Sequence, residues 1–188
     1  RSQAIVQMDA DTLAIEKIVD LKHKSDEAIW GISLWLNEKN ELFIYGMRNE
    51  GGIEGVKKSS LDAANKYKKL YVAKVDASKG LEFAADLRNW QAWNGKTCSK
   101  NLNTRTSLIP KRDSISDELS IRRVNISGRP TFVMVTFDTS VGYSDWKDLY
   151  LYSACEPQGP FDNKYFVYRT PTAGQTKLPG MTDSQSLQ

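Results

Sequence analysis

Apolar residues recur with two different periods along this chain. From about residue 2 to 24 they recur every three or four positions, which is the period of an amphipathic helix. Beyond this segment, apolar and polar residues alternate in several short runs, as in half-buried strands. The first pattern predicts an N-terminal helix whose packing and assembly face carries Ile5, Met8, Ile15 and Val19.

The alternating runs predict hairpins. Residues 28–36 and 41–45 flank the polar turn Asn37–Asn40, so we expect two antiparallel strands. A second hairpin is expected from residues 119–126 and 131–137, which flank a turn that contains Gly128. Further strands are predicted at residues 70–75, 149–154 and 165–169.

Two more helices are predicted between the hairpins. The first begins at Ser59, with Asp62 at the spacing of a capping box. The second covers about residues 78–93 and ends at Asn94-Gly95, a pair typical of helix ends. The fold class expected from these elements is α+β, with the N-terminal helix packed on a mainly antiparallel sheet and two short additional helices.

Length and composition indicate one domain. The chain has 188 residues, of which 40% are hydrophobic and 26% charged, enough for a real core. We expect a single domain over residues 1–170, and a tail over residues 171–188 because that segment is rich in Pro, Gly, Ser, Thr and Gln. No apolar run is long enough to cross a bilayer. Since the first residue is Arg1, either a mature exported protein or a soluble fragment of a chain with an N-terminal membrane segment is expected.

The two cysteines leave two alternatives open. Cys98 and Cys155 lack the spacing of a zinc site. Joined as a disulfide they would close a long loop and favour an oxidising, extracytoplasmic compartment (periplasmic, cell-surface or secreted). The alternative is two buried free thiols in a cytosolic protein.

The sequence offers no catalytic constellation. The single histidine, His23, lies between two lysines, and no Gly-x-Ser-x-Gly elbow accompanies it. The acidic pairs Asp9/Asp11 and Asp117/Glu118 do not resemble facing glycosidase carboxylates. We therefore expect a protein that is not an enzyme and that carries no metal and no cofactor.

Charge and aromatic residues suggest protein partners. Basic and acidic residues are interleaved, for a net charge of only +3, so nucleic-acid binding is not expected. Aromatic residues crowd the C-terminal quarter of the chain, where they predict a contact or ligand surface made of Tyr143, Trp146, Tyr150 and Tyr152.

An amphipathic N-terminal helix before a small α+β head with a C-terminal disulfide resembles a type IV pilin or pseudopilin. This resemblance implies a non-enzymatic structural subunit that packs against other subunits through the first helix. Cys98 and Cys155 would then bound an exposed loop region. The family's N-terminal processing segment is absent from the sequence, so the resemblance is one of architecture.

Two alternatives remain open. The 32–44 hairpin together with the later one is similar to an extracytoplasmic PAS-like sensor domain, which would bind a small ligand against Trp35, Tyr45 and the 96–117 loop. The other alternative is an accessory subunit of a large complex, held by its first helix and its tail.

Overall fold

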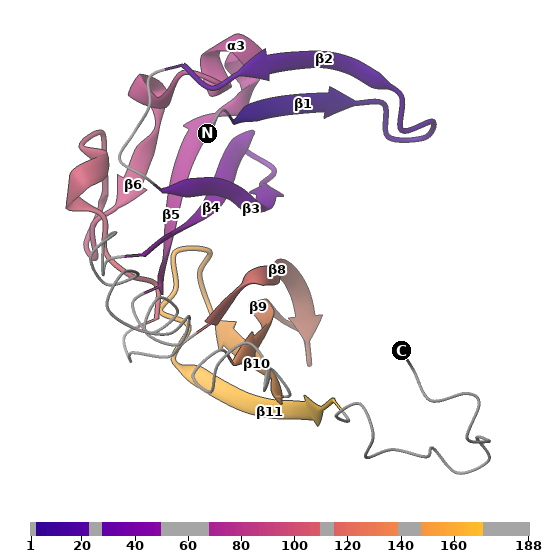
Figure 1. Ribbon diagram of the computed structural model, residues 1–188, viewed down its shortest axis with the longest axis vertical. Coiled ribbons are helices and arrows are strands. Elements are labelled where there is room, and N and C mark those ends of the chain that lie inside the picture. Colours follow the sequence, from indigo (N-terminus) through magenta and orange to yellow (C-terminus); the bar gives the residue numbers. More distant parts are fainter. Residues whose placement is uncertain (1–2, 23–27, 50–67, 110–114, 139–147, 171–188) are drawn as a thin grey trace, which may run out of the picture.

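The fold is built almost entirely of antiparallel β-sheet (Figure 1). The computed structural model describes residues 3–22, 28–49, 68–109, 115–138 and 148–170. A two-stranded sheet is followed by a five-stranded and a four-stranded sheet. Their strands are β1 (Ala4–Met8) and β2 (Ile15–Asp20); β3 (Ile29–Leu36), β4 (Glu41–Asn49), β5 (Lys68–Asp76), β6 (Gln91–Trp93) and β7 (Cys98–Ser99); and β8 (Ile115–Ile126), β9 (Arg129–Asp138), β10 (Asp148–Ala154) and β11 (Asn163–Arg169).

Each of the two larger sheets is a meander in which strands consecutive in the sequence are neighbours. Alternation explains how β9 divides its side chains between two faces. Phe132, Met134 and Thr136 are buried, whereas Val133 and Val135 are half-exposed. The strands predicted at residues 28–36, 41–45, 70–75, 119–126, 131–137, 149–154 and 165–169 are therefore confirmed, with small shifts at their ends.

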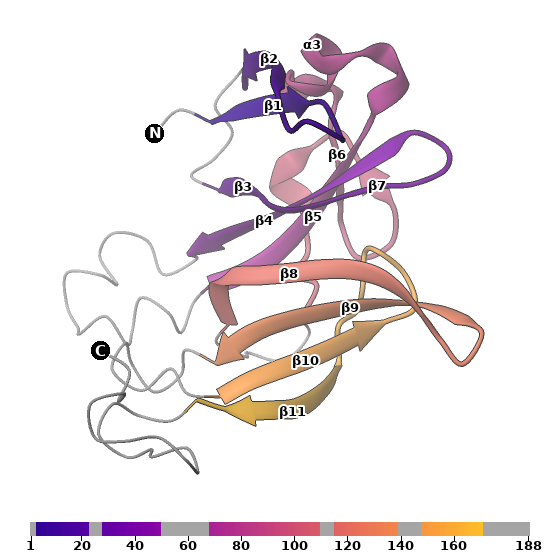
Figure 2. The same ribbon diagram turned by 90° about the vertical axis from the view of Figure 1, so that its right-hand side faces the viewer.

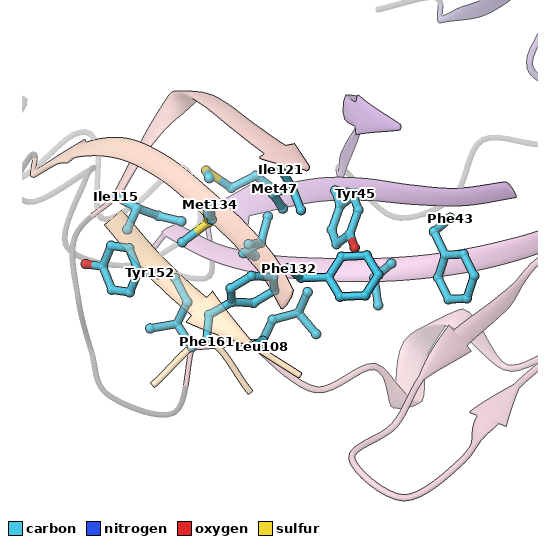
Figure 3. Close-up of a cluster of buried hydrophobic side chains, with 14 residues drawn as sticks. Phe43, Tyr45, Met47, Leu108, Ile115, Ile121, Phe132, Met134, Tyr152 and Phe161 are labelled. Carbon is cyan, nitrogen blue, oxygen red and sulfur yellow. The ribbon is translucent and has the colours of Figure 1, made fainter. Parts of the chain in front are cut away.

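The two larger sheets pack face to face and enclose the main apolar cluster (Figures 2 and 3). Tyr45, Leu70 and Val72 come from the five-stranded sheet, and Ile121 and Met134 from the four-stranded sheet. Loop residues close the ends of this sandwich core, where Leu108 and Phe161 are fully buried. Sheet-on-sheet packing of this kind gives a core about 10 Å thick.

The sandwich is tied along one side by the first strands of its two sheets, β3 and β8. The Ser33 hydroxyl accepts a hydrogen bond from the Ile121 backbone N–H at 3.1 Å and lies 3.3 Å from the Ile121 carbonyl oxygen. A bulge between Trp30 and Ser33 turns this hydroxyl out of its own ladder, and Gly31 within it has φ of 89°. A left-handed φ of this size favours glycine.

A second apolar cluster lies on the other face of the five-stranded sheet. Trp30 and Trp90 meet there edge to face, with ring centroids 5.5 Å apart. A Cβ added to Gly46 would lie 2.4 Å from the Trp30 ring, so the indole needs glycine on the adjacent strand. Ile5 and Leu21 of the N-terminal segment pack against this cluster.

The predicted N-terminal helix is wrong, because residues 4–20 form a β-hairpin. The Asp9 carboxylate accepts hydrogen bonds from the backbone and the hydroxyl of Thr12, each at 2.7 Å, and so fixes the turn. Ile5 pairs with Val19 and Met8 with Ile15. The four residues of the expected helix face therefore lie on two faces of a hairpin, and the fold class is β rather than α+β.

Of the two additional predicted helices, the first starts outside the described residues and the second is wrong. Residues 50–67, which include the start of the helix expected at Ser59, lie outside the described residues, and β5 begins at Lys68. Residues 78–93 form one helical turn, α3 (Leu81–Ala84), between 3₁₀ turns at Ala77–Lys79 and Leu87–Asn89, followed by β6. Asp86 interrupts the helix because its carboxylate accepts from the Arg88 backbone N–H, which caps the second 3₁₀ turn.

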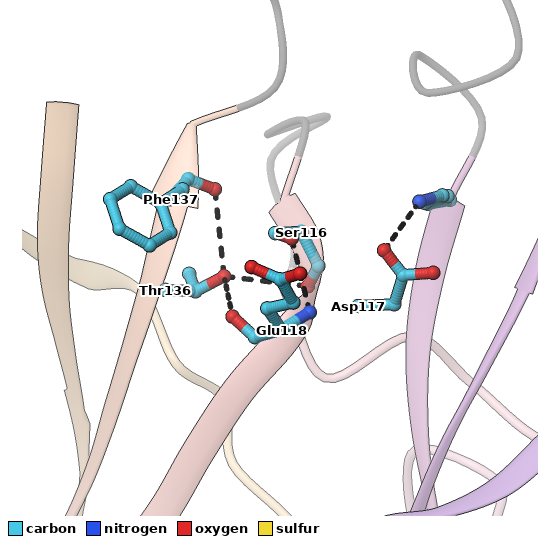
Figure 4. A network of polar contacts seen from close by, with 6 residues as sticks. Ser116, Asp117, Glu118, Thr136 and Phe137 are labelled. Carbon is cyan, nitrogen blue, oxygen red and sulfur yellow. Dashed lines mark hydrogen bonds and ion pairs between the residues drawn. The ribbon is translucent and has the colours of Figure 1, made fainter. Parts of the chain in front are cut away.

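The start of β8 is held by the polar contacts shown in Figure 4. The buried Thr136 hydroxyl lies 3.4 Å from the carbonyl oxygens of both Ser116 and Glu118. These contacts accompany the register shift between Ile115 and Leu119. Lys68 pairs with Asp117 at 2.9 Å and links β5 to this end of β8.

Candidate functional site

A cleft of about 790 Å³ lies at the end of the sandwich that carries the β3–β4 turn, and residues of both larger sheets line it. The β3–β4 and β8–β9 turns project at this end of the molecule (Figure 2). The cleft is lined by the β3–β4 turn and the strand ends beside it, by single residues of β5, β7 and β8, by two residues of β9, and by the loop after β10: Trp35, Leu36, Asn37, Glu38, Lys39, Glu41, Phe43, Lys74, Cys98, Arg123, Pro130, Phe132, Cys155, Glu156, Pro157 and Gln158.

Three aromatic rings form the apolar part of the cleft. The Trp35 ring lies 5.1 Å from that of Phe43 and 4.7 Å from that of Phe132, centroid to centroid. Phe43 and Phe132 are buried, whereas Trp35 is only partly so. The two phenylalanines therefore fix a tryptophan that still borders the cleft.

An ion pair lies beside these rings. Lys74 Nζ donates to Glu41 Oε1 at 2.5 Å, and the Asn37 amide donates to Glu41 Oε2 at 2.8 Å. The hydrogen bond from Lys74, followed by that from Asn37, lowers the pKa of Glu41 below its ordinary value of 4.5. Glu41 is therefore a carboxylate at neutral pH, with both oxygens engaged.

Asn37 also shapes the turn that forms one wall. Its side-chain oxygen accepts from the backbone N–H groups of Lys39 and Glu41, at 2.9 and 2.8 Å. Asn40 in the same turn has φ of 58°, a left-handed conformation that asparagine tolerates better than most residues. The chemistry of this turn is local, so the position of Glu41 follows from the Asn37–Asn40 segment itself.

The opposite wall is the loop after β10, and it is anchored from the core. The Tyr45 hydroxyl donates to the Pro157 carbonyl oxygen at 2.8 Å. Burial raises the pKa of Tyr45 well above its ordinary value of 10.0, so the hydroxyl keeps its proton. Glu156 and Gln158 are thereby presented on either side of an anchored residue.

Charges in the cleft balance. Glu41 pairs with Lys74, and Glu38 lies 3.9 Å from Arg123. Lys39 and Glu156 complete three acids and three bases among the lining residues. A site with this balance exerts little net attraction on a strongly charged ligand and offers many hydrogen-bond donors and acceptors.

Both cysteines border the cleft, but they are not joined. Cys98 is half-buried on β7 and Cys155 is exposed after β10, and both are free thiols. Burial raises the pKa of the Cys98 thiol. The expected disulfide is therefore wrong, and the extracytoplasmic location that it supported stays a prediction.

Two of the four residues of the predicted aromatic contact surface, Tyr150 and Tyr152, lie in the part of the chain that the structure describes. Tyr143 and Trp146 lie outside the described residues, as does His23. Tyr152 is 1% exposed within the sandwich core, and Tyr150 is half-buried against Phe166, with ring centroids 5.9 Å apart. These two tyrosines therefore pack within the protein.

Of the two residues that the sensor alternative names, one lines the cleft and the other contacts its wall. Trp35 lines it, and Tyr45 anchors its wall from below. Asn37, Glu41 and Lys74 were not predicted as site residues, because isolated polar residues along a sequence are typical of any solvent-exposed surface. The signal that could have found two of them is the Asn37–Asn40 turn, which carries a carboxylate at its end.

Neither a metal site nor a membrane helix is found in the part of the chain that the structure describes. Within it, no group of three or more His, Cys, Asp or Glu side chains could hold a metal ion. Among the same residues no helix is long and apolar enough to cross a bilayer.

Comparison with known proteins gives a family and a fold. A family model described as "Domain of unknown function (DUF5005)" matches residues 1–182. No curated protein sequence matches the chain. The structure resembles a crystal structure from Bacteroides ovatus ATCC 8483 that is described as a "putative hydrolase", with a TM-score of 0.53 and 14% identity over 87% of this chain. This chain spans only 34% of the length of that protein.

These findings correct two expectations from the sequence. The pilin resemblance is wrong, since the chain matches another family and lacks the helix-on-sheet fold. The expectation of a non-enzymatic protein is contradicted by the likeness to a protein described as a "putative hydrolase". At 14% identity this likeness concerns the fold, and the chemistry has to be argued from the cleft.

Proposed function

The chain belongs to the DUF5005 family, a domain of unknown function. We propose that its cleft binds a neutral, polar small molecule of the carbohydrate class. The observation that carries this proposal is the position of Trp35 beside a charge-balanced polar rim. Binding sites for small molecules combine apolar walls with a few placed polar groups.

The two parts of the cleft match the two parts of a sugar. A pyranose ring has an apolar face of C–H groups, which packs on an aromatic ring. Its hydroxyls both donate and accept, as does the side-chain amide of Gln158. The cleft volume of about 790 Å³ falls within the range of small-molecule pockets, which run from roughly 300 to 1,000 Å³.

The absence of net charge argues against the other common ligand classes. A nucleotide or phosphorylated ligand would require unpaired cations or a helix N-terminus. Of the three cations that line the cleft, Lys74 is paired with Glu41 and Arg123 lies near Glu38, which leaves Lys39 as a single cation for a phosphate group. A purely apolar ligand would leave the six charged groups of the rim desolvated without new partners.

Titration calorimetry with a panel of neutral oligosaccharides tests the proposal. We expect binding by the wild-type chain and a loss of about tenfold or more in affinity for Trp35→Ala, since removing a stacked aromatic ring costs roughly 1–3 kcal/mol. Tyr165→Ala is the matched control, because Tyr165 is an aromatic residue, 55% exposed, on β11 and away from the cleft. Equal affinities for the two variants would contradict the proposal.

Hydrolysis of the bound carbohydrate is the second candidate. The observation that favours it is the presence of three carboxylates, Glu38, Glu41 and Glu156, at one cleft, since glycoside cleavage uses a pair of acids. The fold likeness to a protein described as a "putative hydrolase" points the same way. Release of reducing ends from a bound oligosaccharide, lost in Glu156→Gln with binding retained, would establish this reaction.

The subunit and sensor roles expected from the sequence stay predictions. Binding of a small ligand is the part of the sensor hypothesis that the cleft supports.

A further inference from the structure

One row of side chains crosses three strands of the five-stranded sheet at its cleft end. Trp35 on β3 pairs with Phe43 on β4, and Phe43 pairs with Lys74 on β5. Residues that pair directly across a ladder share a face. Glu41 shares this face as well, because it precedes Phe43 by two positions on the same strand. All four side chains line the cleft, so the Trp35 ring and the Lys74–Glu41 ion pair belong to one surface of the sheet.

The ion pair on this surface is held in place from both sides. Lys74 Nζ donates to Glu41 Oε1 at 2.5 Å, and the Asn37 amide donates to Glu41 Oε2 at 2.8 Å. The Asn37 side-chain oxygen accepts in turn from the Glu41 backbone N–H at 2.8 Å. Lys74 and Glu41 both lie on strands. A ligand that binds this pair therefore has few side-chain rotamers to order, which lowers the cost of binding.

The pair keeps hydrogen-bonding capacity for a ligand. An ammonium group has three donors, and a carboxylate has about four acceptor sites. The contacts with each other and with Asn37 use one donor of Lys74 and two acceptor sites of Glu41. The side chains of Lys74 and Glu41 are 27% and 32% exposed, so a molecule in the cleft can reach them. The cleft thus offers a charged donor and a charged acceptor side by side.

We propose that the Lys74–Glu41 pair recognises a vicinal diol of the sugar, an inference that rests on the carbohydrate binding proposed above. One hydroxyl donates to Glu41 and its neighbour on the ring accepts from Lys74, while the ring packs on Trp35. Hydrogen bonds to ionised groups are about twice as strong as those between neutral groups. The ligand is therefore a saccharide unit with two adjacent free hydroxyls, and substitution of these hydroxyls excludes it.

The other ion pair at the cleft is too loose for this role. Glu38 and Arg123 lie 3.9 Å apart, and the Glu38 side chain is 96% exposed. Glu38 belongs to the β3–β4 turn, whereas Arg123 belongs to β8 of the other sheet. An exposed pair of this length does not fix either partner in one geometry. Selection of the hydroxyl pattern therefore falls to Lys74 and Glu41.

Titration calorimetry with cellotriose, maltotriose, xylotriose and mannotriose, each beside the form whose vicinal hydroxyls are methylated, tests the proposal. Methylation keeps the oxygen acceptors but removes the hydroxyl donors. We expect the wild type to bind a parent trisaccharide about tenfold or more tightly than its methylated form, the effect of losing a hydrogen bond to a charged group. Lys74→Met should bind both forms with nearly the same reduced affinity, because it removes the ammonium and releases Glu41.

Lys68→Met is the matched control. Lys68 lies on the same strand and face as Lys74 and pairs with Asp117 at 2.9 Å, outside the cleft lining. This variant should keep the wild-type preference for the parent trisaccharide. Circular dichroism melting confirms that each variant is folded. If Lys74→Met does not fold, Glu41→Gln serves in its place, since it keeps the size of the side chain and should lower the same preference.

Equal affinities of the wild type for the parent and methylated forms would overturn the proposal, as would a preference that survives unchanged in Lys74→Met. Trp35→Ala separates this proposal from carbohydrate binding itself, because it should weaken both forms alike and leave their ratio unchanged. If Trp35→Ala weakens binding and Lys74→Met leaves the preference intact, carbohydrate binding stands and the role of the ion pair fails. A wild-type chain that binds none of the trisaccharides would overturn both.

Discussion

The interior of the sandwich and its cleft end are built from the same two sheets, but their aromatic residues have different neighbours. In the interior, Phe161 and Tyr152 are at most 1% exposed and are surrounded by apolar side chains. At the cleft end, Trp35 packs on Phe43 and Phe132 on one side and borders a rim of paired charges on the other. The difference teaches that burial alone separates rings that stabilise the fold from a ring that is free to meet a ligand.

The largest expected effect comes from emptying the interior. Phe161→Ala should lower the free energy of unfolding by about 3–5 kcal/mol, because it leaves a cavity among fully buried neighbours. Urea unfolding at 25 °C measures this change. A loss of less than about 1 kcal/mol would contradict the view that the interior rings stabilise the fold.

A smaller loss is expected on the far face of the five-stranded sheet. Gly46→Ala places a methyl group 2.4 Å from the Trp30 ring, and overpacking of this kind costs about 1–3 kcal/mol. Thermal melting monitored by tryptophan fluorescence should show a lower Tm and a changed signal from Trp30. Gly128→Ala is the control for the methyl group alone, since nothing lies within 4 Å of its added Cβ, although its φ of 81° adds local strain.

Removing one hydroxyl tests the link between the interior and the cleft. Tyr45→Phe deletes the hydrogen bond to the Pro157 carbonyl and should cost about 1 kcal/mol in stability. Since that bond anchors the 155–158 wall, we also expect weaker binding of the cleft ligand, by a factor of a few. Unchanged binding together with lowered stability would show that the wall is positioned without the core.

The smallest effect concerns pH. The pKa of Glu41 is lower in the folded chain than its ordinary value of 4.5. The ionised Glu41 therefore stabilises the folded state above the pKa of the unfolded chain, and this stabilisation is lost as pH falls through the pKa of the folded chain. In Glu41→Gln this loss should be absent. At pH 7 the variant should be less stable than the wild type by about 0.5–1 kcal/mol, the value for a partly exposed pair. This difference should shrink below pH 4. Urea unfolding at pH 7 and pH 3.5 measures both values. A difference that does not change with pH would exclude the ion pair as its source.

The strands of the two larger sheets could be predicted from the sequence because their signals are local. Alternation across residues 28–45 and 119–137, with polar turns between, determines hairpins without reference to the rest of the chain. The N-terminal segment could not be predicted in this way, because spacings of three and four residues also arise when two strands flank a turn. Asp9 and Thr12 form that turn, and the resulting hairpin is held by tertiary contact with Ala85, whose carbonyl accepts from Lys22 at 2.9 Å.

The cleft was predicted only in part, for a related reason. Trp35 was recognised as a ligand-contact residue under the sensor hypothesis, since it lies in a clear strand. Its polar partners come from β5, β8 and the loop after β10, and no local pattern brings Lys74, Arg123 and Glu156 together. Such a site depends on how two sheets are stacked, which the hairpin signals do not specify.

The most direct test of the account is an NMR titration of the tryptophan indole N–H signals with a neutral oligosaccharide that the chain binds. Trp35 lines the cleft, whereas Trp90 is buried on the other face of the five-stranded sheet. The account predicts that the Trp35 signal shifts in a saturable manner and that the Trp90 signal stays in place. Binding that leaves Trp35 unmoved, or a panel of neutral oligosaccharides that moves no signal, would contradict it.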